Sequence, residues 1–110
     1  MHPSQITIPQ AVEALLQNAP LPFAKLMEHG TMSVEYYAPA EVDKQTPHRQ
    51  DEIYIIMHGT GMFNRNGEII AFAPGDVLFV PAGMEHRFEN FTNDFATWVI
   101  FYGADGGEAA

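Results

Sequence analysis

Residues 75–90 read GDVLFVPAGMEHRFEN. The four apolar residues at 77–80 are typical of a short β-strand. The Pro-Ala-Gly sequence at 81–83 predicts a tight turn, because proline fixes φ and glycine accepts a positive φ. A second strand is expected at 86–91, with alternate side chains on opposite faces. This stretch therefore predicts two short strands joined across a turn.

Short strands and turns are expected outward from this stretch as well. The Asn-Gly pair at 66–67 is a strong hairpin signal between two strand-like runs. Strands are also predicted at 32–36, 53–57, 62–65, 68–72 and 96–102. The polar, proline-containing segment 38–47 is expected to be a loop.

Before the strands, residues 9–17 predict one short helix. Val12, Leu15 and Leu16 recur at helical spacing as one apolar stripe, and Thr7 is placed to cap the first turn. About seven strands after one short helix indicate an all-β fold, an antiparallel sandwich or barrel.

The length and composition indicate one globular domain. The chain has 110 residues, of which 46% are hydrophobic and 17% charged. Residues 1–30 are expected to be a lead-in with the short helix, residues 31–102 the barrel, and residues 103–110 a small, acidic tail that frays.

The charge and the cysteine content exclude several classes of function. Fourteen acidic and five basic side chains give a net charge of −9, which argues against nucleic-acid and anionic-membrane partners. The absence of cysteine excludes disulfide scaffolds, cysteine zinc sites and iron–sulfur clusters. No signal sequence and no membrane-length apolar run is visible, so a cytoplasmic protein is expected.

The spacing of residues 75–90 resembles the second motif of the cupin superfamily. That motif requires two glycines, a proline, a histidine and an asparagine at fixed intervals. The chain supplies them all, as Gly75, Pro81, Gly83, His86 and Asn90.

Residues 46–59 resemble the first cupin motif, with one departure. His48, Glu52 and Gly59 match the motif, but Thr46 stands where the family has its leading histidine. The resemblance implies a small jelly-roll barrel, the double-stranded β-helix, as found in single-domain cupins.

The resemblance also implies a divalent metal ion, Fe, Mn, Ni or Zn, near the centre of the barrel. By position in the motifs, its ligands would be His48, Glu52 and His86. Two histidines with one carboxylate suit non-haem Fe(II) and leave positions open for substrate and oxygen.

The spacing of His48 and Glu52 requires a bend in the backbone. In a straight strand their side chains would be separated by roughly 13 Å, too far to share an ion. A bulge or a loop-to-strand transition is therefore expected between them. If the bend falls differently, Asp51 or Gln50 becomes the ligand instead.

Other residues are candidates for the pocket around this site: Thr46, Gln50, Tyr54 and Phe88. Plainer interpretations stay open, since His86 could be a buried histidine without metal and His48 could be exposed to solvent. His58 is expected at the surface or in a turn, outside the metal site. No separate general base is evident, and Tyr36, Tyr54 and His58 are no more than candidates for one.

Three functions are compatible with these residues. The first is a metal-dependent oxygenase or isomerase, with Fe(II) or Mn(II), that acts on a small organic molecule. The second is a small-molecule binding or sensing module without turnover, and the third is a structural barrel. The resemblance also implies a homodimer. The helix at 9–17 and the strand at 32–36 carry apolar side chains that must be buried, and a second copy of the chain could bury them.

Overall fold

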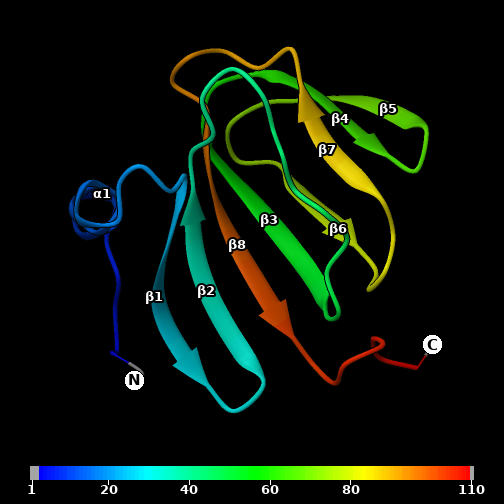
Figure 1. Cartoon of the computed structure of the whole chain (residues 1–110), viewed down its shortest axis with the longest axis horizontal. Helices are drawn as coiled ribbons and strands as arrows, with labels where there is room; N and C mark the ends of the chain where they lie inside the picture. The colour runs from blue at the N-terminus through cyan, green and yellow to red at the C-terminus, as the bar shows by residue number, and fades with distance from the viewer. Residues whose placement is uncertain (1–2, 110) are drawn as a thin grey trace.

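The computed structural model describes residues 3–109, and it arranges them as two antiparallel sheets with one short helix (Figure 1). The larger sheet has the strand order β1-β2-β8-β3-β6, and the smaller has the order β5-β4-β7. The elements are α1 (Ile8–Gln17), β1 (Phe23–His29), β2 (Met32–Tyr37), β3 (Asp51–His58), β4 (Gly61–Arg65), β5 (Glu68–Phe72), β6 (Val77–Val80), β7 (His86–Glu89) and β8 (Ala96–Tyr102). The predicted all-β jelly roll is confirmed. In the part of the chain described, no helix is long and apolar enough to cross a membrane.

Two turns depend on backbone conformations that glycine favours. Asn66 and Gly67 have φ values of 51° and 95°, as a type I′ turn requires, and they join β4 to β5 in the predicted hairpin. Gly59 has a φ of 86°, and a Cβ there would lie 2.6 Å from the Cα of Phe95. The glycine of the first motif therefore allows two backbone segments to approach closely.

The strand β1 is not predicted from the sequence, which treats residues 1–30 as a lead-in with one short helix. In the structure β1 pairs with β2 at the edge of the larger sheet (Figure 1). Its register shifts between Lys25 and Met27, so the pattern of alternate residues is interrupted by a bulge. An edge strand also tolerates charged residues such as Glu28, which weaken the apolar signal.

The helix α1 packs against the outer face of the larger sheet. Thr7 caps it as predicted, accepting a hydrogen bond from the Gln10 backbone N–H. The buried contact differs from the predicted stripe, because Ala11 is fully buried against Tyr36 of β2 while Val12 remains exposed. The small alanine lets the helix backbone approach the sheet closely.

The main core lies between the two sheets and is rich in aromatic rings. Tyr54, Phe63 and Phe88 are 1% exposed or less and contact one another with ring centroids 4.9–5.8 Å apart. In β2, Tyr36 belongs to the cluster under the helix, whereas Tyr37 belongs to this core. Glu35 therefore shares the inward face of β2 with Tyr37.

The segment after β8 contacts the start of β3, although the sequence predicts a frayed tail. The Gly106 N–H donates to the Arg49 carbonyl, and the Glu108 N–H donates to the Asp51 carboxylate. Gly103, Gly106 and Glu108 thus tie this segment to the rest of the domain by hydrogen bonds, and Ala110 lies outside the described residues.

Candidate metal centre

A loop-to-strand transition brings His48 and Glu52 together. His48 lies in the loop before β3, and the strand begins at Asp51, so the backbone bends between the two side chains. Glu52 is 1% exposed and faces the space between the sheets. His48 Nε2 lies 4.0 Å from Glu52 Oε1, far less than a straight strand would allow.

The first residue of β7 completes the cluster. His86 Nε2 lies 2.8 Å from Glu52 Oε1. On the other side of the ring, His86 Nδ1 lies 2.9 Å from the Met84 carbonyl oxygen. A carbonyl oxygen only accepts, so Nδ1 carries a proton and Nε2 is the nitrogen that can bind a metal.

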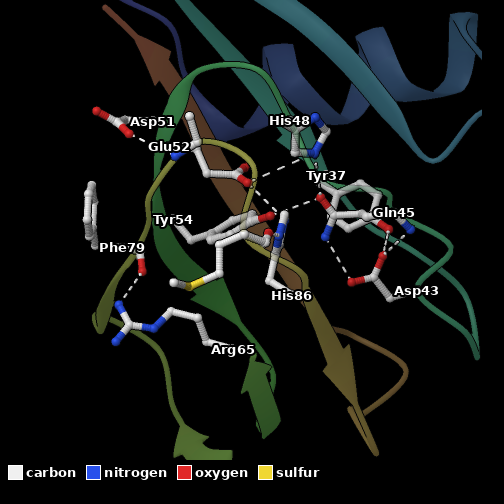
Figure 2. A network of polar contacts seen from close by, with 12 residues as sticks. Tyr37, Asp43, Gln45, His48, Asp51, Glu52, Tyr54, Arg65, Phe79 and His86 are labelled. Carbon is white, nitrogen blue, oxygen red and sulfur yellow. Dashed lines mark hydrogen bonds and ion pairs between the residues drawn. The ribbon is translucent and has the colours of Figure 1, made fainter. Parts of the chain in front are cut away.

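The three side chains converge on one point from two sheets and a loop (Figure 2). Ligand atoms of His48, Glu52 and His86 all lie within 4.8 Å of one another. Apart from the 2.8 Å contact between Glu52 Oε1 and His86 Nε2, both carboxylate oxygens of Glu52 and His86 Nε2 are buried without a hydrogen-bond partner among the described residues. Buried polar atoms in proteins are nearly always paired, because desolvating them is costly. A divalent ion would satisfy all three atoms, so the donor set fits a metal.

The two histidines differ in their proton affinity. Burial lowers the pKa of His48, and the opposing charge of Glu52 offsets only part of this effect. Burial also lowers the pKa of His86, but the hydrogen bond and charge of Glu52, the Met84 carbonyl and the charge of Asp43 together raise it by more, so that the pKa lies above its usual value. Protons therefore compete with a metal ion more strongly at His86 than at His48.

The two alternative ligands, Asp51 and Gln50, make hydrogen bonds away from the cluster, so the structure favours Glu52 as the carboxylate ligand. Asp51 accepts hydrogen bonds from the backbone N–H groups of Glu108 and Ala82, and these bonds lower its pKa. Gln50 donates to the carbonyl oxygens of Thr31 and Gly103, so it is not a pocket residue either. Because strand neighbours alternate, Glu52 faces inward when Asp51 faces outward.

The other pocket candidates lie at different distances from the cluster. Tyr54 is fully buried beside it, with ring centroids of Tyr54 and His86 6.0 Å apart. Thr46 is exposed in the loop before β3 and lines the surface hollows on both the His48 side and the His86 side of the cluster. Phe88 contacts Tyr54 and belongs to the aromatic core, so it supports the pocket without lining it.

Of the three candidates for a general base, two do not contact the metal cluster. His58 is exposed at the far end of β3, as expected, and Tyr36 lies under the helix. Tyr54 is the one of the three that reaches the site. Its pKa is raised by burial first and then by the Glu52 charge, so the hydroxyl keeps its proton and acts as a donor.

Two hollows reach the cluster from outside. One, of about 660 Å³, has a largely apolar lining that includes His48, Val99 and Phe101. The other, of about 450 Å³, is lined by His86 and by polar residues such as Arg87. The larger hollow has the size of a small-molecule site.

Three residues near the cluster are missed by the sequence reasoning: Glu35, Asp43 and Gln45. Glu35 lines the larger hollow together with His48. Asp43 and Gln45 lie in the loop before β3, where a polar sequence has no periodicity that would mark an inward side chain. Residues 31–37 alternate between the two faces of the strand. If the helix had been expected to cover the face that carries Tyr36, Glu35 would have been predicted on the opposite, inward face.

Comparisons with known proteins agree with the fold and bear on the site. Residues 33–102 match the family described as Cupin domain. An uncharacterized protein of Streptomyces coelicolor is 33% identical over 81 residues, which cover 72% of this chain and 77% of that protein. A gentisate 1,2-dioxygenase of a Streptomyces species is 28% identical over 68 residues, 61% of this chain but only 19% of the enzyme.

The likeness to solved structures concerns the fold. The crystal structure of a cupin superfamily protein from Desulfitobacterium hafniense superposes with a TM-score of 0.64 at 19% identity. The match covers 91% of this chain and 93% of that one.

Proposed function

This chain belongs to the cupin domain family, and from that premise we propose that it is a metal-dependent enzyme acting on a small organic molecule, an oxygenase or an isomerase. His48, Glu52 and His86 would hold one divalent ion, Fe(II) or Mn(II). The single observation that carries the proposal is the convergence of His48, Glu52 and His86, whose ligand atoms lie within 4.8 Å of one another, with the Glu52 and His86 atoms buried and contacting only each other.

Different residues of the site would bind the metal ion, bind the substrate and donate a hydrogen bond to it. A bound ion would supply Lewis-acid or oxygen-activating chemistry. The apolar lining of the larger hollow, with Val99 and Phe101, would exclude water and bind the carbon skeleton. Tyr54 would stay protonated as a hydrogen-bond donor.

Glu35 is the group best placed to exchange a proton with a substrate. It lines the larger hollow beside His48. Burial raises the pKa of its carboxyl, Lys25 opposes this effect, and the charge of Glu52 raises the pKa further. A carboxyl with a raised pKa is a better base than an ordinary one near neutral pH.

Oxygen uptake tests the enzymatic part of the proposal. The chain would be loaded with Fe(II) without air and then mixed with oxygen and a panel of small phenolic and hydroxy acids that includes gentisate. Oxygen consumption with loss of a substrate, absent in His86→Ala, supports an oxygenase. Conversion of a substrate without oxygen uptake supports an isomerase. Tight ligand binding with no conversion would favour the binding module instead.

Metal affinity is expected to depend on pH through His86. A proton at His86 Nε2 competes with a metal ion, and the raised pKa of His86 strengthens this competition. Apparent Mn(II) affinity should therefore weaken as the pH falls through that pKa, by up to about tenfold per pH unit. Titration calorimetry at a series of pH values measures this slope, with His58→Ala as the control. An affinity that stays constant from about pH 5.5 to 8 would contradict the role of His86.

The homodimer that the resemblance implies stays a prediction. The apolar side chains of α1 and β2 are partly buried against each other, through Ala11 and Tyr36. Large apolar side chains remain exposed on β5 and β6, namely Ile69, Ile70, Val77 and Phe79. A dimer through these strands would cover them, and light scattering at micromolar concentration should give twice the chain mass. A monomer mass would count against it.

A further inference from the structure

The loop before β3 is anchored across the fold by a buried aspartate. Asp43 is 6% exposed. Its carboxylate accepts hydrogen bonds from the Tyr37 hydroxyl at 2.6 Å, the Phe88 backbone N–H at 2.8 Å and the Gln45 backbone N–H at 2.9 Å. These donors come from β2, β7 and the loop itself, so Asp43 holds the loop in place between the sheets.

Asp43 also fixes the orientation of the Gln45 amide. Gln45 Nε2 donates to the second carboxylate oxygen of Asp43 at 2.8 Å. A carboxylate only accepts, so the amide nitrogen must face Asp43 and the carbonyl oxygen must face the other way. The direction of Oε1 is thus set by the chemistry of its neighbour.

The carbonyl oxygen of Gln45 faces the metal cluster (Figure 2). Gln45 Oε1 lies 3.3 Å from His48 Nε2 and accepts a hydrogen bond from the Tyr54 hydroxyl at 2.9 Å. A carbonyl oxygen has two lone pairs, so besides the bond from Tyr54 it has one lone pair for the contact with His48 Nε2 or, in its place, for a metal ion. Tyr54 thereby holds the oxygen in place beside the metal-binding nitrogen of His48.

Three of the distances between donor atoms are compatible with ligands in one coordination shell, and the ligand atoms of His48, Glu52 and His86 lie no more than 4.8 Å apart. In an octahedral shell with bonds of about 2.1 Å, neighbouring ligands lie roughly 3 Å apart and opposite ones roughly 4.2 Å apart. The observed distances are 2.8 Å for His86 to Glu52, 3.3 Å for His48 to Gln45 and 4.0 Å for His48 to Glu52.

We propose that Gln45 Oε1 is a fourth ligand of the metal site, supplied by the residue before Thr46 rather than by Thr46 itself. The inference rests on the proposed metal binding and names one more donor in it. An amide carbonyl is a hard, neutral oxygen ligand, so it would favour Mn(II) and Fe(II) over softer ions. The site then has two nitrogen and two oxygen donors and keeps positions open.

Electron–nuclear double resonance tests this ligand directly. The chain would carry ¹³C at the glutamine side-chain carbonyl and be loaded with one equivalent of Mn(II). A ¹³C coupling of a directly bound carbonyl is expected in the wild-type chain. The other four glutamines, at positions 5, 10, 17 and 50, are exposed or face away from the cluster.

Two matched variants assign the coupling. Gln45→Met keeps the length of the side chain without the oxygen, and it should lose the ¹³C coupling and bind Mn(II) on the order of tenfold more weakly. Gln50→Met, on the same loop but facing outward, should keep both.

The possible results distinguish the claim that Gln45 is a ligand from the broader claim that the chain binds a metal ion. Mn(II) binding without a ¹³C coupling in the wild-type chain would overturn the ligand role of Gln45 while leaving the metal site intact. A coupling that persists in Gln45→Met would overturn it too. A wild-type chain that binds no Mn(II) would overturn the metal site and the fourth ligand together. The wild-type measurement depends on no variant, so a misfolded variant leaves the test decisive.

Discussion

Replacing His86 with alanine is expected to abolish metal binding. His86 Nε2 is buried and touches Glu52 Oε1, so the substitution removes one donor and leaves the carboxylate without its neighbour. Changing a residue that only supports a ligand already costs 10- to 100-fold in affinity, so losing a ligand should cost more than about 100-fold. Glu52→Gln keeps the size of the side chain and removes the negative charge, and a similar loss is expected. Metal per chain, measured by plasma mass spectrometry, should fall to near zero in both.

The matched control is His58→Ala on the same strand. His58 is exposed at the far end of β3, so its loss should leave the metal content unchanged. Full occupancy in His86→Ala would show that the ligands are assigned wrongly. So would a loss of metal confined to His58→Ala.

Stripping the metal is expected to lower the melting temperature by about 10 °C or more. A ligand that binds only the folded chain stabilises it by about 2.7 kcal/mol at one hundred times Kd. In a domain of about 100 residues, 1 kcal/mol corresponds to a shift of roughly 4–8 °C. Buried, unpartnered oxygens on Glu52 make the metal-free site costly, which adds to the expected effect. Calorimetric scans with and without Mn(II) measure the shift.

The His86→Ala variant serves as the control for this shift. Its melting temperature should not respond to Mn(II), because the site that links binding to folding is broken. Equal melting curves for the loaded and the fully stripped wild-type chain, with metal loss verified, would contradict the claim that the metal stabilises the fold.

Most of the fold could be predicted because its signals are local. The Asn-Gly turn at 66–67 and the alternating apolar strands depend on neighbouring residues, and the structure confirms them. The strand β1 could not be predicted, because its bulge after Lys25 and its charged residues follow from its place at a sheet edge. The burial of Ala11 depends on how closely the helix approaches the sheet, which no local pattern encodes.

The candidate site could be predicted only as far as the motifs reach. His48, Glu52 and His86 occupy motif positions, and the structure brings them together. Gln45 could not be found in this way, because it stands one residue away from the motif position. Its direction depends on Asp43, and Asp43 is held by β2 and β7, elements distant from it in the sequence.

The most direct test of the central claim is anomalous diffraction from crystals of the Mn(II)-loaded chain. The account predicts one anomalous peak per chain at the manganese edge, between the side chains of His48, Glu52 and His86, with Gln45 Oε1 also in contact. A crystal of the loaded chain with no anomalous peak among these residues would contradict the account.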